Sequence, residues 1–290
     1  MFKTVHKTVW AYDVEWVPDP MAGRLLLNLS EDLDDAEVIK RMWIHGGATD
    51  EDPMPFLKMV MCRIVSIVAV QRKVHPDRHV SVDLLSMPRD VSDPDQTAED
   101  AMIGRFLEAV GRICPQLVGY NSSDADLKIL LQRAVVNGLQ AEGFCTRPDK
   151  PWEGVDYFAR ESEYNLDLMR IMGGWGRGMP SLNELATLSG IPGKMDVDGN
   201  SVAVLWLQGE RQRIVNYNEF DALTTYLLWL RIAHLAGKFS TPEYEEEQER
   251  VRELLRTEGR APGREHLLEY LEYWDALSRT VAGSRPARIS

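Results

Sequence analysis

An apolar run within Met59 to Gln71 limits what this chain can fold into more than any other segment. The run reads Val-Met-Cys-Arg-Ile-Val-Ser-Ile-Val-Ala-Val, and its length and β-branched residues predict a buried strand. Thr8 to Val17 is rich in β-branched and aromatic residues and is followed by Pro18, which predicts a second strand. Further candidate strands are His79 to Leu85, Gln116 to Tyr120 and, as a hairpin partner for the first strand, Arg24 to Asn28.

The apolar spacing becomes helical from Ala98 onward. The predicted helices are Ala98 to about Ile113, Asp124 to Asn137, an interrupted segment from Leu166 into the 190s, Ile214 to Leu235, and two charged helices between Thr241 and Leu277. The acidic stretch before the apolar run predicts a loop with one short helix. Strands first and helices last predict an α/β fold, with a mixed sheet covered by helices over residues 1–237 and a helical extension over 238–290.

The second helix of the extension carries a stripe of large apolar residues at Leu267, Leu271 and Trp274. So much apolar surface is rarely left exposed. We therefore expect this helix to pack on the main domain or on a second copy of the chain, which would make a homo-oligomer.

Composition excludes some classes of function. The net charge of −12 argues against a tight, sequence-reading binder of duplex nucleic acid, although a metal enzyme can cluster carboxylates and let bound cations supply positive charge. No apolar run approaches the roughly 18 residues that a membrane span needs. The three cysteines are scattered and odd in number, so we expect reduced thiols in a cytoplasmic protein rather than a disulfide framework.

Asp13 and Glu15 lie two residues apart on the first predicted strand, so both side chains share one face. Neighbouring carboxylates repel each other and are costly to bury without a cation. Such a pair suits a divalent metal ion, because hard cations prefer oxygen ligands. The alternative is a solvated pair on an edge strand.

Three further residues are candidates, and each also has a purely structural interpretation. Asp126 lies at a predicted helix start, where an acid also complements the helix dipole. Tyr217 and Asp221 share one face of a predicted helix, where they could simply hydrogen-bond each other. Glu219 is the nearest competing acid, but on a helix it points away from that face.

The order of these residues resembles the DEDD superfamily of 3′→5′ exonucleases: Asp-x-Glu on a strand, Asp at a helix start, and Tyr-x-x-x-Asp on a late helix. The similarity is to the branch of predicted exonucleases related to the proofreading domain of family B DNA polymerases, and it extends over roughly residues 8 to 237. The segments that carry it are residues 11–19 (Ala-Tyr-Asp-Val-Glu-Trp-Val-Pro-Asp), 117–127 (Leu-Val-Gly-Tyr-Asn-Ser-Ser-Asp-Ala-Asp-Leu), 181–185, 190–194 and 214–223 (Ile-Val-Asn-Tyr-Asn-Glu-Phe-Asp-Ala-Leu). Two positions depart from the family pattern, with Trp16 in place of threonine and Ala125 in place of phenylalanine.

The resemblance implies a ribonuclease H-like exonuclease domain over residues 1–237 that holds two Mg²⁺ or Mn²⁺ ions. Asp13 would bridge both ions, Glu15 and Asp221 would complete the site of the attacking water, and Asp126 would support the second ion. Tyr217 would orient the water. The implied substrate is a single-stranded 3′ end, with DNA favoured over RNA, and the products would be nucleoside 5′-monophosphates.

The residues that would contact this substrate are Val14 and Trp16 at the terminal base, together with Asn121, Arg177 and Lys194. Two other functions stay open at this point. One is a catalytically silent exonuclease-like module that binds nucleic-acid ends or serves as a scaffold. The other is a protein-interaction module in which the acids are unrelated to catalysis.

Overall fold

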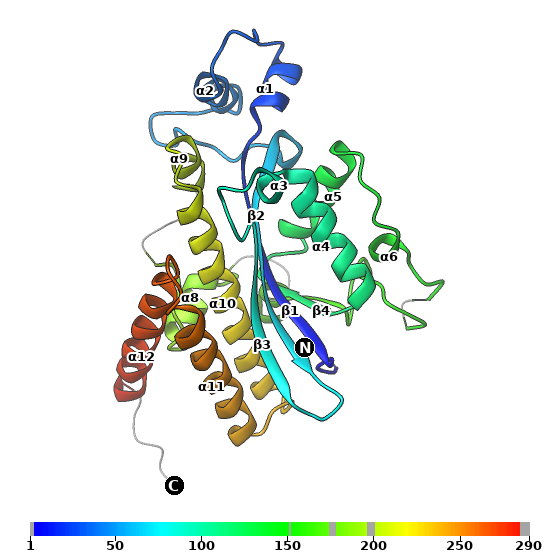
Figure 1. Cartoon of the computed structure of the whole chain (residues 1–290), viewed down its shortest axis with the longest axis vertical. Helices are drawn as coiled ribbons and strands as arrows, with labels where there is room; N and C mark the ends of the chain where they lie inside the picture. Colours follow the sequence, from blue (N-terminus) through cyan, green and yellow to red (C-terminus); the bar gives the residue numbers. More distant parts are fainter. Residues whose placement is uncertain (1–2, 151, 174–177, 196–200, 285–290) are drawn as a thin grey trace.

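β1 (Thr8–Pro18) is the central strand of a five-stranded mixed sheet with the order β3-β2-β1-β4-β5 (Figure 1). It pairs antiparallel with β2 and parallel with β4. The other strands are β2 (Cys62–Val74), β3 (Val80–Met87), β4 (Gln116–Gly119) and β5 (Asn165–Asp167). The computed structural model describes residues 3–150, 152–173, 178–195 and 201–284.

Helices cover both faces of this sheet, which is the α/β arrangement that the sequence predicted. One face packs on α4 (Glu99–Ile113) and α5 (Asp126–Val136), and the other on α10 (Arg211–Leu235). The remaining helices are α1 (Pro20–Leu27), α2 (Asp35–His45), α3 (Pro94–Thr97), α6 (Glu142–Cys145), α7 (Leu168–Gly173), α8 (Leu182–Leu188), α9 (Ser201–Leu207), α11 (Thr241–Glu258) and α12 (His266–Ser284), with one 3₁₀ turn at Met59–Met61.

The alternation of β1 decides which of its side chains meet which helix layer. Val9 and Ala11 are buried in the cluster that includes α10, whereas Trp10, Tyr12 and Val14 are buried in the cluster that includes α4 and α5. This period-two pattern places the odd-numbered residues of the strand on the side of α10. Asp13 and Glu15 continue the odd-numbered series.

The prediction of a hairpin partner at Arg24 to Asn28 was wrong. These residues lie in or just after α1, whose N-cap is Asp19 and whose first turn contains Pro20. The Asp19 carboxylate accepts a hydrogen bond from the amide of Met21, and proline at the first helical turn favours the helix. The true antiparallel partner of β1 is β2, which lies beyond the α1–α2 segment.

The α1–α2 segment projects from one end of the sheet (Figure 1). It has a small hydrophobic cluster of its own, formed by Val38, Met42 and Met61. Buried Asp19 ties its start to α5, because the Arg133 guanidinium lies 2.8 Å from that carboxylate. The segment is therefore joined to the main body by an ion pair as well as by the chain.

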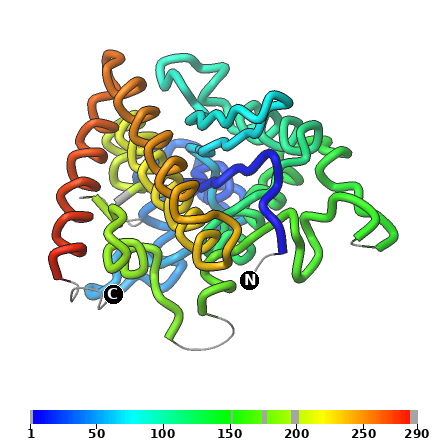
Figure 2. The backbone as a smooth tube through the Cα atoms, turned by 90° about the horizontal axis from the view of Figure 1, so that it is seen from below, coloured from blue at the N-terminus to red at the C-terminus, as the bar shows by residue number. Residues whose placement is uncertain are grey.

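α11 and α12 lie beside α10, as Figures 1 and 2 both show. Tyr270, Leu271 and Trp274 are buried in the same hydrophobic cluster as α10, which confirms that the apolar stripe of the last helix packs within the chain. Arg72 of β2 also forms a buried bidentate ion pair with Glu247 of α11, with nitrogen–oxygen distances of 2.6 to 3.1 Å. The boundary at residue 237 and the homo-oligomer stay predictions.

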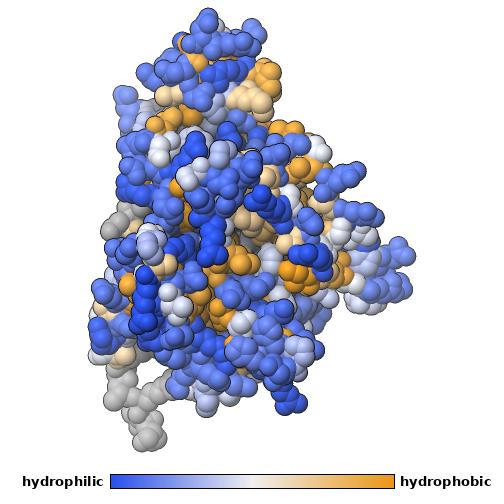
Figure 3. Space-filling model, in the orientation of Figure 1, coloured by the Kyte–Doolittle hydropathy of each residue, from blue (hydrophilic) through white to orange (hydrophobic). Residues whose placement is uncertain are grey.

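Hydrophilic residues cover most of the face seen in Figure 3, and smaller apolar patches lie among them. No helix in the described ranges is both long and apolar enough to cross a membrane. The three cysteines are free thiols, and burial raises the pKa of Cys62 to about 12.

Candidate active site

Asp13, Glu15 and Asp221 meet between the centre of the sheet and α10. One carboxylate oxygen from each residue lies within 4.8 Å of those of the other two. Asp13 and Glu15 lie opposite Val68 and Ser66 of β2, and Asn218 of α10 donates a hydrogen bond to the Ser66 hydroxyl, 3.0 Å away. This bond fixes α10 against β2 beside Glu15.

Asp126 joins this group from the other helix layer. β4 pairs with β1 only as far as Ala11, so the amide of Val14 lies beyond that ladder. Asp126, the first residue of α5, accepts a hydrogen bond from this amide at 3.0 Å. The carboxylate of Asp126 is thereby held at the strand that carries Asp13 and Glu15.

The turn before α5 is held by Asp167 at the end of β5. Its carboxylate accepts hydrogen bonds from the amides of Asn121 and Ser123, at 3.0 and 3.1 Å. Asn121 has a left-handed backbone with a φ of 61°. Gly119 permits the tight approach that follows, because a β-carbon there would lie 2.3 Å from that of Ser122. These contacts set where α5 begins, and therefore where Asp126 lies.

Tyr217 and Asp221 share one face of α10, as their spacing predicted. Tyr217 is buried against α9 in a cluster with Ile214 and Val202. Burial, followed by the charge of Asp221, raises the pKa of the Tyr217 hydroxyl far above its ordinary value. The hydroxyl therefore stays protonated at neutral pH and can donate a hydrogen bond.

The four carboxyls all hold their protons more tightly than free carboxyls do. Burial, reinforced by the neighbouring carboxylates, raises the pKa of Asp13 and Glu15 well above the ordinary range. Burial also raises the pKa of Asp126 to about 7 and that of Asp221 to about 6, although a hydrogen bond with Tyr217 opposes the rise at Asp221. A divalent cation would relieve this repulsion, and an all-oxygen donor set suits Mg²⁺ or Mn²⁺.

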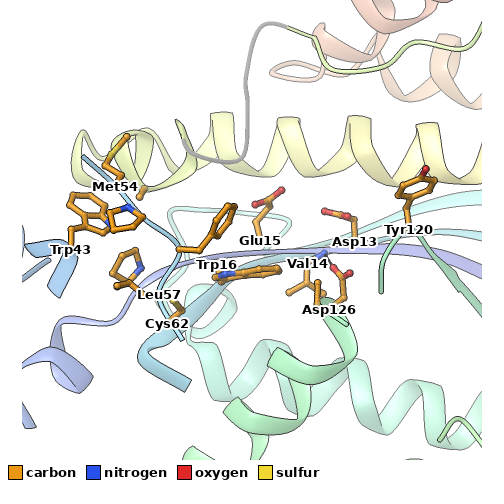
Figure 4. A pocket seen from close by; sticks show the side chains of 15 residues that line it. Asp13, Val14, Glu15, Trp16, Trp43, Met54, Leu57, Cys62, Tyr120 and Asp126 are labelled. Carbon is orange, nitrogen blue, oxygen red and sulfur yellow. Dashed lines mark hydrogen bonds between the residues drawn. The ribbon is translucent and has the colours of Figure 1, made fainter. Parts of the chain in front are cut away.

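A pocket of about 250 Å³ opens onto the carboxylates. Asp13, Glu15 and Asp126 line it together with Tyr120 and Ala125. In Figure 4, Asp13, Asp126 and Tyr120 lie toward one end of the pocket and Trp43 and Met54 lie at the other. Asp13, Glu15 and Asp126 are thus open to a ligand that enters this pocket.

The predicted substrate contacts are placed differently from one another. Val14 and Trp16 line the pocket, Val14 being buried and Trp16 partly exposed. Asn121 lies in the turn held by Asp167. Lys194 is exposed, and its charge opposes the burial-driven rise in the pKa of Glu15 and Asp221. Arg177 falls outside the described residues.

Two residues near the site were missed from the sequence. Asp167 was assigned to a helical segment, but the structure has β5 at that point, and this three-residue strand is too short for a periodic signal. The sequence signal that could have revealed Asp167 is its position just before a helix start. There its carboxylate accepts a hydrogen bond from the amide of Met169. Tyr120 was quoted only as part of a motif, yet it lines the pocket and donates to the carbonyl of Pro180 at 2.5 Å.

A family model described as a predicted 3′-5′ exonuclease related to the exonuclease domain of PolB matches residues 54–274, about three quarters of the chain. The chain belongs to this exonuclease family. Its mixed sheet flanked by helices is consistent with a ribonuclease H-like exonuclease fold. No curated protein matches the sequence.

The matched range of the exonuclease family includes Asp126, Tyr217 and Asp221, whereas Asp13 and Glu15 precede it. It also continues through α11 and into α12, so the expectation that the resemblance ends at residue 237 was wrong. The physical reason is that both helices share a hydrophobic cluster with α10, which carries part of the site.

Proposed function

We propose that this protein is a divalent-metal-dependent 3′→5′ exonuclease that hydrolyses single-stranded nucleic-acid ends, with DNA favoured over RNA. The observation that carries the proposal is the convergence of Asp13, Glu15 and Asp221 within 4.8 Å, with Asp126 lining the same pocket. Membership of the exonuclease family supports nuclease activity in general.

The donor set fits two Mg²⁺ or Mn²⁺ ions. The charges of Asp126, Glu15 and Asp221 all act on Asp13 and raise its pKa, which suits a carboxylate shared by both ions. Glu15 and Asp221 would complete one ion site, and Asp126 would complete the other. When bound, a pair of such ions activates the attacking water and stabilises the leaving oxygen in phosphodiester hydrolysis.

Tyr217 has the role of orienting the attacking water. Its hydroxyl is held beside Asp221 and keeps its proton, so it acts as a hydrogen-bond donor or acceptor and not as a base. The charge of Lys194 lowers the pKa of both Glu15 and Asp221, and we propose that Lys194 contacts the substrate phosphate. Asn121 is proposed as a second contact beside the helix start that carries Asp126.

The test is incubation of end-labelled single-stranded DNA and RNA with Mg²⁺ or Mn²⁺. We expect a ladder that shortens from the 3′ end and releases nucleoside 5′-monophosphates. A blocked 3′ end should stop digestion, and a blocked 5′ end should not.

Two results would count against the proposal in different ways. Cleavage of a circular strand, or release of nucleotides from the 5′ end, would refute the 3′→5′ exonuclease activity. Either result would leave the proposed metal site standing. Metal-dependent binding of ends without any hydrolysis would favour the silent end-binding module.

A further inference from the structure

The pocket that opens onto the carboxylates does not end there. Beyond Trp16 it continues into a part lined by apolar and aromatic side chains, as Figure 4 shows for Trp16, Leu57 and Trp43. The residues of this far part come from α2 and from the segment after it, and they are Trp43, Met54, Pro55, Phe56 and Leu57. A substrate bound at the acids would therefore meet these side chains next.

The aromatic rings of this far part lie outside the hydrophobic cluster of the α1–α2 segment. That segment is packed around Val38, Met42 and Met61, and Trp43 and Phe56 are not part of this cluster. Phe56 is 88% exposed, and Trp43 is partly exposed. Large rings that face a pocket and are left in water are typical of a binding surface.

The charges of the pocket also favour contacts with bases over contacts with phosphates. Its lining contains Asp13, Glu15 and Asp126, and none of its described lining residues is lysine or arginine. Apart from Lys194 and the proposed divalent ions, the pocket therefore offers a nucleic-acid strand no ion pairs with its phosphates, which are the usual source of affinity. The π faces of unpaired bases are the part of such a strand that these rings can bind.

We propose that Trp43 and Phe56 extend the expected base contact of Trp16 into a stacking subsite for the unpaired bases next to the scissile phosphate. This inference rests on the proposed exonuclease function and assigns the α1–α2 segment a role in selecting single strands. A base that lies against these rings inside the pocket cannot stay paired with a complementary strand. Ala125, which also lines the pocket, has a small side chain that leaves room for a base.

The experiment compares two 3′ ends of otherwise identical single strands, one with ordinary bases and one with abasic sites at its last three positions. The wild type should degrade the ordinary end with a kcat/KM about tenfold or more above that of the abasic end. Trp43→Ala and Phe56→Ala should each lower kcat/KM on the ordinary end by about tenfold, mainly through KM, because stacking is present in both ground and transition states. On the abasic end both variants should match the wild type.

Trp152→Ala is the matched control, since this tryptophan is 80% exposed and does not line the pocket. It should behave as the wild type on both ends. Phe56→Ala removes a ring from outside the hydrophobic clusters, so its melting temperature should be unchanged even if Trp43→Ala lowers stability.

The outcomes distinguish a failure of the exonuclease function from a failure of the stacking subsite. A wild type that degrades neither end would overturn the exonuclease function. A wild type that degrades both ends equally, or variants that lose the same activity on both ends, would overturn the stacking subsite and leave the function standing.

Discussion

The backbone amide of Val14 donates a hydrogen bond to Oδ1 of Asp126 across 3.0 Å. This one bond connects the strand that carries Asp13 and Glu15 with the helix that carries the fourth acid. Asp126 thus has two separable roles: its carboxylate accepts a hydrogen bond from β1, and its negative charge can bind a cation.

Replacing Asp126 by Asn or by Ala separates these two properties. Asp126→Asn keeps an acceptor for Val14 and removes the charge, so we expect loss of metal-dependent activity with the fold intact. Asp126→Ala also leaves a buried amide without a partner, which costs about 1–3 kcal/mol. Urea unfolding should show the Ala variant to be less stable than the Asn variant by that amount, and equal stabilities would contradict this role of the bond.

The metal-free protein should lose stability as the pH rises. The pKa of Asp126 is raised by burial from 3.8 to about 7, and that of Asp221 to about 6. A carboxyl with a higher pKa in the folded state stays protonated where the unfolded chain has already ionised, so its favourable contribution is complete below pH 3.8 and is lost as the pH rises through the folded pKa. Melting temperatures in a chelator should therefore fall between about pH 4 and 7.

A control for this pH effect is Asp13→Asn, which removes a carboxyl whose own pKa is raised well above the ordinary range by burial and by Asp126, Glu15 and Asp221. Its melting temperature should change less over the same pH range. A wild-type stability that rises with pH throughout the range would contradict the crowding of the acids.

Divalent ions should reverse this loss at neutral pH. A ligand that binds only the folded state at about 100 times its Kd adds roughly 2.7 kcal/mol per site. Millimolar Mn²⁺ should therefore raise the melting temperature by several degrees, and Asp13→Asn should largely abolish the rise. The absence of a shift in the wild type at any Mn²⁺ concentration would argue strongly against a metal site.

Tyr217 and Asp221 should differ in how much activity their loss removes. Tyr217→Phe deletes one positioned hydroxyl, and the loss of one such group costs roughly 10²–10³ in rate. Asp221→Ala removes a proposed metal ligand and should abolish hydrolysis. Single-turnover digestion of a labelled strand measures both, and equal losses would show that Tyr217 does more than orient water.

The buried ion pair between Arg72 and Glu247 should be important for stability. Removing one partner leaves an uncompensated buried charge, which costs about 3–5 kcal/mol. Glu247→Ala should be strongly destabilised, whereas Glu245→Ala, on the exposed side of α11, should match the wild type. Deletion of residues 240–290 should be more damaging still, and an unchanged melting temperature after that deletion would refute the packing of the extension on the main domain.

Periodicity predicted which side chains share a face, and the resemblance to the exonuclease superfamily singled out Asp13, Glu15, Asp126, Tyr217 and Asp221 as candidates. Asp13, Glu15, Tyr217 and Asp221 lie on long elements whose spacing decides which side chains share a face. Asp167 was missed because its role depends on amides of a turn far away in sequence. The apolar residues of the segment at Arg24 to Asn28 are three leucines, which are good helix formers, and the cap at Asp19 and the proline at the first turn start a helix before them.

Glu219 of α10 is wholly buried and lies within hydrogen-bonding distance of Arg264 and His266, at 2.5 and 2.6 Å. The helix that carries Asp221 is thus held in part by Arg264 and His266, which are synthesised long after Asp13. A growing or prematurely ended chain would hold the first acids without the last, or without the contacts that seat them. We therefore expect nuclease activity to appear only when synthesis of the chain is nearly finished.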